Sequence, residues 1–225
     1  MTISFADADR GIQGVAIAGV GTLLKVGDEL SAAPPPQLQR DGEAWGVAAG
    51  DALALTLTPI AATAEAADAP VAAYVAAGSA GRHRVEGLAL LRREREAGGL
   101  ALERSLAVLF DAHLALALHA SRPRGAGGHG EEQLEAILLR GEPLDLVAIE
   151  KPRLSSTYGA DGRLTHAGLE LWESEESELP LRIGGEALAG GELGGPDGAP
   201  VQVTFVDWHH DGRRGLGSYT IARGG

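Results

Sequence analysis

The chain has no cysteine and no long hydrophobic run. Without cysteine among its 225 residues, disulfides, a thiolate nucleophile and cysteine metal ligands are excluded. The uncharged stretches Ala52–Ala64 and Ala69–Gly81 have 13 residues each and none in the chain exceeds 14, fewer than the roughly 20 that a membrane-spanning helix needs. The N-terminus lacks a basic segment followed by an apolar one. We therefore expect no signal peptide and no integral membrane segment, and a cytoplasmic location.

Positive charge and aromatic side chains are also scarce. The chain has 31 acidic and 19 basic residues, a net charge of −12, and only nine aromatic residues. Because nucleic-acid binding depends on neutralising phosphates, an acidic chain without a basic patch is not expected to bind nucleic acid. Only two of the basic residues are lysines, a bias typical of GC-rich bacterial genomes. Alanine (39 residues) and glycine (33) dominate instead.

The second half of the chain shows a clear strand pattern. Two extended runs, Leu144–Tyr158 and Leu164–Trp172, flank an Asp161-Gly162 pair, which suits the positive φ angles of a tight hairpin turn. A further strand is expected at Leu181–Ala189, followed by a glycine-rich turn region at Gly190–Gly198.

A second hairpin is predicted near the end of the sequence. Apolar residues alternate with polar ones at Val201, Val203 and Phe205. The Asp211-Gly212 pair then turns the chain into Gly215–Ala222, which we expect to form the returning strand.

The alanine-rich first half is decided by alternation rather than by helix propensity. Every even position of Leu106–Leu118 is apolar, which is the period of a strand, and the length of this run favours a hairpin near Asp111-Ala112. The same alternation predicts a strand at Ala52–Thr58. The segment Glu86–Glu96 could form a strand or one short helix.

Together these patterns predict an all-β protein, an antiparallel barrel or sandwich with few short helices. Pro34–Pro36 and Glu65–Pro70 are expected to be loops. We treat residues 1–225 as a single domain, with a division into two related β modules near residues 121–130 left open. The similarity of Arg10–Ala18 to Arg214–Ala222 supports two modules in which these strands occupy equivalent positions.

Three segments resemble a known family. They are His129–Glu132, then Pro152–Tyr158 with the following turn and Gly168–Trp172, and finally Asp211–Tyr219. Together they resemble the lipocalin-like proteins grouped around hydroxyneurosporene synthase, the carotenoid hydratase, mainly over residues 129–225. The resemblance implies lipocalin-like β-barrel modules around a cavity for a hydrophobic molecule, often an isoprenoid or polyketide. It transfers no catalytic residue to this chain.

Motifs for nucleotides and nucleophilic catalysis are incomplete. Gly19-Val20-Gly21 before Lys25 lacks the further glycine of a dinucleotide fingerprint and the Gly-Lys-Ser/Thr of a phosphate loop, so a turn is expected there. The Gly-rich segment around Ser79 has no alternation of strands and helices around it, which a nucleophile elbow requires. We therefore expect no nucleotide cofactor.

Metal ligands are also not predicted. The candidates are His209-His210-Asp211, Asp111 with His113, and His129-Gly130-Glu131. Adjacent strand residues point to opposite faces, so His209 and His210 cannot share a site, and no three-ligand spacing is present. We therefore expect no bound metal ion and no other cofactor.

Candidate site residues lie on the predicted strands of the second half. Asp207 and His209 share a face with Phe205, while Trp208 points to the other side; Glu170 and Trp172 share a face of their own strand. A carboxylate among apolar neighbours would have a shifted pKa suited to acid–base chemistry. The alternative is that these groups lie at the rim of the barrel and form ion pairs with arginines such as Arg213 or Arg214. We predict catalytic roles for Asp207, Glu170 and Tyr219, and ligand contacts for Trp208, Trp172, Phe205 and His209.

Two functions fit this sequence. One is a cofactor-independent enzyme, a hydratase, isomerase or cyclase, that acts on a small hydrophobic molecule by acid–base chemistry. The alternative is a non-catalytic protein that binds or carries such a molecule. A cavity with a buried acid beside an aromatic ring would favour the enzyme, and an aliphatic cavity would favour the carrier. A third role, in protein interaction, would require an exposed apolar patch, and the oligomeric state is left open.

Overall fold

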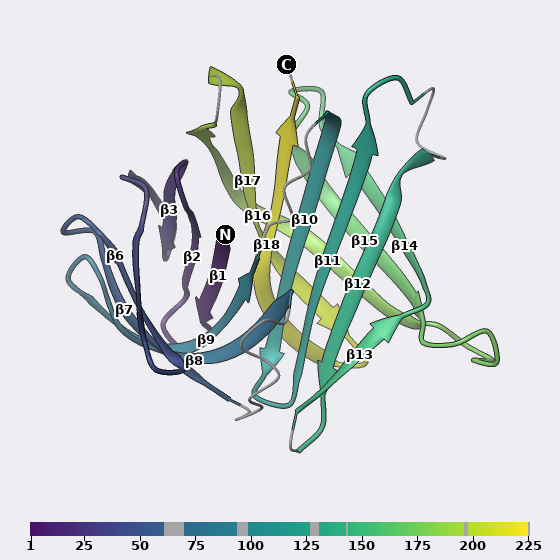
Figure 1. Cartoon of the computed structure of the whole chain (residues 1–225), viewed down its shortest axis with the longest axis horizontal. Helices are drawn as coiled ribbons and strands as arrows, with labels where there is room; N and C mark the ends of the chain where they lie inside the picture. Colours follow the sequence, from purple (N-terminus) through teal and green to yellow (C-terminus); the bar gives the residue numbers. More distant parts are fainter. Residues whose placement is uncertain (61–69, 94–98, 127–130, 143, 196–197, 225) are drawn as a thin grey trace.

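The computed structural model describes residues 1–60, 70–93, 99–126, 131–142, 144–195 and 198–224. These residues form eighteen β-strands and no α-helix (Figure 1). The first nine strands are β1 (Thr2–Asp7), β2 (Ile12–Ile17), β3 (Gly21–Val26), β4 (Glu29–Ala33), β5 (Gln37–Asp41), β6 (Ala44–Ala49), β7 (Leu53–Pro59), β8 (Val71–Ala80) and β9 (His83–Arg92). The second nine are β10 (Leu100–Asp111), β11 (Leu114–Pro123), β12 (Gln133–Arg140), β13 (Asp145–Ile149), β14 (Lys151–Tyr158), β15 (Leu164–Trp172), β16 (Leu181–Gly194), β17 (Pro200–His210) and β18 (Arg213–Arg223).

The two sheets have the same topology. The first has the order β4-β3-β2-β1-β9-β8-β7-β6-β5, and the second has the order β13-β12-β11-β10-β18-β17-β16-β15-β14. Each is an antiparallel meander whose first and last strands pair, so each curls into a nearly closed barrel. The free edges of the first barrel are β4 and β5, which flank Pro34–Pro36. Proline has no N–H to donate to a ladder, which explains a break at this point.

The barrels pack side by side through their first and last strands (Figure 1). Each barrel has its own apolar core, which includes Phe5 and Leu57 in the first and Leu116 and Trp208 in the second. Two further apolar clusters join the sheets. One of these includes Phe205 and packs β17 against β2 and β3. The N-terminal strand β1 and the C-terminal strand β18 are neighbours at this interface.

Most strand predictions are confirmed. The run at Leu106–Leu118 is the hairpin of β10 and β11, and both Asp-Gly pairs lie in hairpin turns. The ambiguous segment Glu86–Glu96 is strand β9 as far as Arg92, because Val85, Ala89 and Leu91 all contribute to the core of the first barrel. Residues 94–96 lie outside the described residues, as does most of the loop expected at 65–70. The described Pro34–Pro36 segment is a loop.

The predicted turn region at Gly190–Gly198 was wrong in its first half, because β16 continues to Gly194. Neighbouring groups approach these glycines closely. A Cβ on Gly190 would lie 2.8 Å from the carbonyl oxygen of Val203, and a Cβ on Gly191 would lie 3.2 Å from Leu23 of the other sheet. Glycine therefore serves close strand packing here and not a turn.

The chain passes from the first sheet to the second between β9 and β10. Strands β11 and β12, on either side of the division considered near residues 121–130, are neighbours in the second sheet. The similar segments Arg10–Ala18 and Arg214–Ala222 cover β2 and β18, which are the second strand of one barrel and the last strand of the other. They are not equivalent, so this short sequence match does not reflect the repeat.

The true equivalence is visible where each barrel joins its first and last strands. A Cβ on Gly87 would lie 2.0 Å from the carbonyl oxygen of Ala6, and a Cβ on Gly217 would lie 1.9 Å from that of Ala107. In both barrels this alanine pairs with the residue after the glycine. Strands β1 and β9 therefore match β10 and β18 in register, and one barrel can be compared with the other residue by residue.

Candidate functional site

The second barrel contains a cavity of about 960 Å³ at the end where β18 terminates. Its walls come from β10, β11, β12, β14 and β18, together with the segment that leads into β12. Apolar side chains form part of the lining: Leu102, Leu134, Leu154 and Ile221. Protein cavities for small molecules typically measure about 300–1,000 Å³, so this one could hold a sizeable ligand.

A polar cluster lies against these apolar walls. Arg104 forms an ion pair with Glu132 through Nη2. Its Nη1 donates hydrogen bonds to the hydroxyl oxygens of Ser156 (3.1 Å) and Tyr219 (3.3 Å). The Tyr219 hydroxyl is also 2.9 Å from that of Tyr158, which lines the cavity. Side chains from β10, β14, β18 and the start of β12 thus meet at one point inside the barrel.

Burial controls the protonation of this cluster. The side chains of Arg104 and Glu132 are 7% and 4% exposed, and Tyr219 is 1% exposed. Burial, strengthened by the hydrogen bond to Tyr158, raises the pKa of the Tyr219 phenol well above its ordinary value. Burial alone would lower the pKa of Arg104, but Tyr219 and Glu132 outweigh it and raise that pKa. Arg104 therefore stays charged, and Tyr219 stays protonated at neutral pH.

The cluster is incompletely satisfied. Arg104 Nε and Glu132 Oε1 are buried and have no hydrogen-bond partner among the described residues. A buried polar atom without a partner costs about 1–3 kcal/mol, and such atoms are rare in folded proteins. The fold therefore tolerates two unfavourable groups at the wall of its cavity.

The first barrel shows that the fold does not need this cluster. In the matched register, the position of Arg104 on β10 corresponds to Ile3 on β1, and the position of Tyr219 on β18 corresponds to Ala89 on β9. Both Ile3 and Ala89 are fully buried apolar residues. Because one barrel folds with apolar side chains at these two places, the fold itself does not require the polar cluster, which makes the cluster a candidate functional site.

A second, smaller cavity of about 310 Å³ lies between the sheets. There Arg92 of β9 approaches two residues of the other sheet, with Nη1 3.2 Å from His119 Nδ1 and Nη2 3.3 Å from Glu103 Oε1. The hydroxyl of Ser105 is 3.3 Å from the same histidine nitrogen. These polar groups interact with one another across the interface, so we interpret them as contacts that hold the two barrels together.

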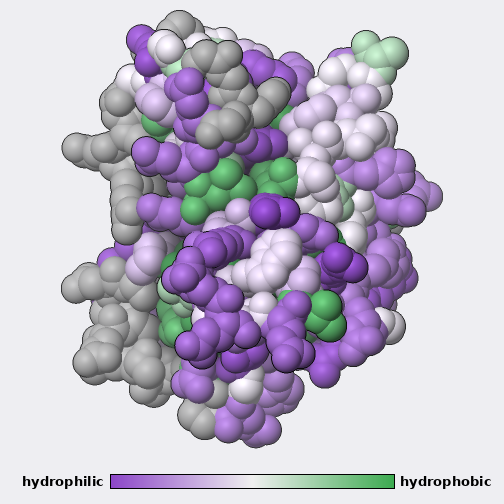
Figure 2. All heavy atoms as spheres, turned by 90° about the vertical axis from the view of Figure 1, so that its right-hand side faces the viewer, coloured by the Kyte–Doolittle hydropathy of each residue, from purple (hydrophilic) through white to green (hydrophobic). Residues whose placement is uncertain are grey.

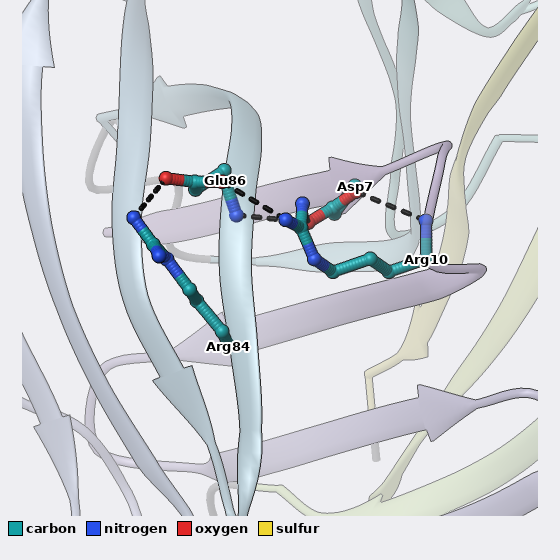
Figure 3. A network of polar contacts seen from close by, with 4 residues as sticks. All are labelled: Asp7, Arg10, Arg84 and Glu86. Atoms are coloured by element: carbon teal, nitrogen blue, oxygen red, sulfur yellow. Dashed lines mark hydrogen bonds and ion pairs between the residues drawn. The ribbon is translucent and has the colours of Figure 1, made fainter.

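The first barrel has its own buried acid, at the turn between β1 and β2 (Figure 3). Asp7 is 1% exposed and accepts hydrogen bonds from the backbone N–H groups of Arg10 (3.1 Å) and Glu86 (2.8 Å), and from Arg10 Nη1 (3.0 Å). Glu86 in turn pairs with Arg10 and Arg84 at the surface. Since both oxygens of Asp7 have partners, this network is structural.

The structure does not bring the three predicted catalytic residues together. Asp207 pairs in register with Leu216 and lies on the face of β17 that looks away from the second core, whereas Tyr219 is inside it. Arg214 Nε donates to both oxygens of the Asp207 carboxylate, at 2.8 Å to Oδ1 and 3.0 Å to Oδ2. This is the rim ion pair that the sequence left as the alternative. His209 Nε2 is 3.8 Å from the same carboxylate and is largely exposed.

The other predicted residues are dispersed. Glu170 lies on the outside of the barrel and accepts a hydrogen bond from Arg182 at 3.2 Å. Trp172, on the same face, lies under the guanidinium of Arg153 at 4.8 Å. Phe205 is buried between the two sheets, and Trp208 is buried in the second core, where its Nε1 has no partner among the described residues. Of the predicted set, Tyr219 alone belongs to the polar cluster.

Sequence reasoning missed Arg104, Glu132 and Tyr158. One signal was present: Arg104 is an even position of β10, on the same apolar face as Leu106 and Val108. A charged residue that continues an apolar face indicates a buried charge. The segments that carry the family resemblance also include Glu132, Tyr158 and Tyr219, all three of which belong to the polar cluster around Arg104.

The described residues show neither a metal site nor a membrane-spanning helix. No group of three or more His, Asp or Glu side chains there could hold a metal ion, and no helix there has the length and hydrophobicity to cross a membrane. The outer face of the second sheet is largely hydrophilic, with small, separate apolar patches (Figure 2). This face does not present the broad apolar surface that an interaction role would use.

The fold and cavity define a lipocalin-like protein built of two β-barrels. No protein-family model matches the chain, and no curated protein matches it. Among solved structures, it is similar to the crystal structure of a protein provisionally described as AttH from Nitrosomonas europaea. The two share 13% sequence identity over 98% of this chain and 90% of the other, with a TM-score of 0.61. At this identity the similarity establishes the fold.

Proposed function

We propose that this protein binds a small, mainly hydrophobic molecule inside its second barrel. The observation that carries the proposal is the contrast between the barrels: the second has a cavity of about 960 Å³ with Arg104 at its wall and Tyr219 hydrogen-bonded behind it, where the first has Ile3 and Ala89. The family resemblance points to an isoprenoid or polyketide as the ligand. The apolar lining supports such a molecule, because its burial would remove hydrocarbon surface from water.

Blocking the cavity tests this proposal. Leu154 lines the cavity, whereas Thr157 on the same strand is exposed. We expect Nile red, an uncharged apolar dye, to bind the protein with increased fluorescence. Leu154→Trp should lower the affinity at least about tenfold by filling the cavity, and Thr157→Trp should leave it unchanged. Failure of the dye to bind, or equal affinity in all three proteins, would refute a ligand site in this barrel.

A catalytic role is the second candidate, and it rests on the chain of groups behind Tyr158. The Tyr158 hydroxyl lines the cavity and contacts the Tyr219 hydroxyl, which accepts a hydrogen bond from the permanently charged Arg104. Tyr158 would donate its hydroxyl proton to an alkene carbon, the first step of hydration, isomerisation or cyclisation, and would regain a proton from the water that adds or from a neighbouring carbon of the substrate.

Isotope labelling separates catalysis from binding. Incubation with an isoprenoid alkene in H₂¹⁸O would produce a labelled alcohol if the protein is a hydratase, whereas isomerisation or cyclisation would change the product's retention without changing its mass. Tyr158→Phe should then lower turnover by about 10²-fold with little change in Nile red affinity. Unchanged substrate under all conditions would leave the binding role alone. The catalytic roles of Asp207 and Glu170 stay predictions, to be tested with Asp207→Asn and Glu170→Gln in the same assay.

A further inference from the structure

We propose that the ligand of the second barrel is an amphiphile whose anionic head group, a carboxylate or a phosphate, is held by arginines at the mouth of the cavity. This inference rests on the proposed function and specifies the class of ligand. It is based on the position of Arg122 and Arg223, which the polar cluster around Arg104 does not use.

The strand register places these two arginines together. Leu102 on β10 pairs with Arg122 on β11 and with Arg223 on β18, so the three side chains point to the same face in one row. Leu102 belongs to the core of the second barrel, which fixes that face as the inner one. Strands lie about 4.8 Å apart, so the two arginine Cα atoms are separated by about 10 Å. Both flexible guanidinium groups could reach one anion above Leu102.

In the next row into the barrel, only the residue on β10 is polar. Arg104 pairs with Ala120 on one side and with Ile221 on the other. The next row, Leu118, Leu106 and Tyr219, completes the inner wall. The mouth arginines therefore have no counter-charge, whereas the one charged residue of the row beneath, Arg104, is paired with Glu132 and its strand neighbours Ala120 and Ile221 are apolar. An anionic head at the mouth with a hydrocarbon tail along the apolar part of the wall matches this arrangement.

Most arginines with described partners form an ion pair with a carboxylate, but neither of these two does. Arg122 has no hydrogen-bond or ion-pair partner among the described residues, and Arg223 donates to the neutral amide of Gln202 at 3.3 Å. By contrast, the Arg104 charge is compensated by Glu132. Four arginines and one carboxylate line the cavity of a chain whose net charge is −12. Such a local excess of positive charge favours an anion, and guanidinium groups bind carboxylate and phosphate through paired hydrogen bonds.

The first barrel again serves as a reference. The residue that matches Leu102 is Met1, just before β1, and the residue that matches Arg122 is Ala18, whose N–H donates to the Met1 carbonyl oxygen at 3.0 Å. Arg122 is thus specific to the barrel that has the polar cluster, whereas Arg223 matches an arginine of the first barrel, Arg93. Because the same place in the first barrel is filled by alanine, packing of this fold does not require an arginine there.

The head group is tested with three ligands of equal chain length: dodecanol, dodecanoate and dodecyl phosphate. Each is titrated, below its micelle concentration, against Nile red bound to the protein at low salt. We expect both anions to displace the dye at concentrations about three- to tenfold lower than the alcohol, and the advantage to shrink as salt is added, because the arginines are partly exposed. Comparison of the two anions decides between a carboxylate and a phosphate.

Two variants locate the effect. Arg122→Gln should remove most of the preference for anions while leaving the affinity for dodecanol unchanged. Arg182→Gln, which changes an exposed arginine on the outside of the same barrel, should keep the preference. If alcohol and anions bind equally, or if Arg122→Gln keeps the full preference, the anionic head group is refuted while the apolar site stands. If neither Nile red nor any of the three ligands binds, the proposed function itself fails, and this inference fails with it.

Discussion

The buried pair of Arg104 and Glu132 gives the sharpest test of the polar cluster. The change is Glu132→Gln, which keeps the shape of the side chain and removes its charge. The guanidinium of Arg104, 7% exposed, would then lack a counter-ion. Removing one partner of a buried pair costs about 3–5 kcal/mol, and we expect the lower end, about 3 kcal/mol, because the pair borders a cavity that can admit water.

The matched control removes both charges. In Arg104→Ile with Glu132→Leu, the first replacement is the residue that the other barrel has at the corresponding position, Ile3. A buried pair replaced by apolar residues is often neutral or stabilising, so we expect the double variant to unfold within about 1 kcal/mol of the original protein. Relief of the two unpartnered atoms contributes to this recovery.

Urea unfolding followed by tryptophan fluorescence measures both variants, since Trp208 is fully buried in the same barrel. The reasoning is refuted if Glu132→Gln costs less than about 1 kcal/mol, because the pair would then be effectively solvated. It is also refuted if the double variant is less stable than Glu132→Gln, because the cluster would then be needed for folding.

Three further predictions concern stability. Burial raises the pKa of Tyr219 above the ordinary 10.0. The contribution of Tyr219 to folding stability is therefore fully present below about pH 10 and is lost as the pH rises toward the pKa of the folded state. In urea unfolding, the stability advantage of the original protein over Tyr219→Phe should shrink above about pH 10. Gly217→Ala should destabilise by about 2 kcal/mol or more in thermal unfolding, because its Cβ would lie 1.9 Å from a carbonyl oxygen, whereas Gly184→Ala, with open space around its Cβ, should be nearly neutral. Asp7→Asn should cost about 2 kcal/mol in urea unfolding, because the NH₂ of the new amide would face a backbone N–H that now donates a hydrogen bond to a carboxylate oxygen. A cost near zero would contradict the buried network.

The fold could be predicted from the sequence because its strands have one buried face and one less buried face. In β7, for example, Leu53, Leu55 and Leu57 are buried and the residues between them are exposed, so the period of two is visible. The repeat could not be found in this way. The matched strands β9 and β18 share topology and one closely packed glycine, Gly87 or Gly217, but few residue types.

The site was harder to predict, because it depends on which strand faces meet across a barrel. Asp207 and Tyr219 lie on adjacent strands, and sequence alone suggested that they would meet. The register puts Asp207 opposite Leu216 and Tyr219 opposite Thr204, on opposite faces of the sheet. Glu132 comes from the segment before β12 and has no periodicity to place it. Long-range pairing, which no local pattern encodes, therefore decides the composition of the cluster.

The two barrels act as an internal comparison within one chain. They share topology, register and the close glycine packing, so a residue demanded by the fold should recur at matched positions. Ser4 and Ser105 do match in this way, and both lie at the interface between the sheets. Arg104 and Tyr219 do not, since Ile3 and Ala89 stand in their places. The first pair of residues follows from joining two barrels, whereas the second pair is not required by the shared fold, which is why the predictions above test it.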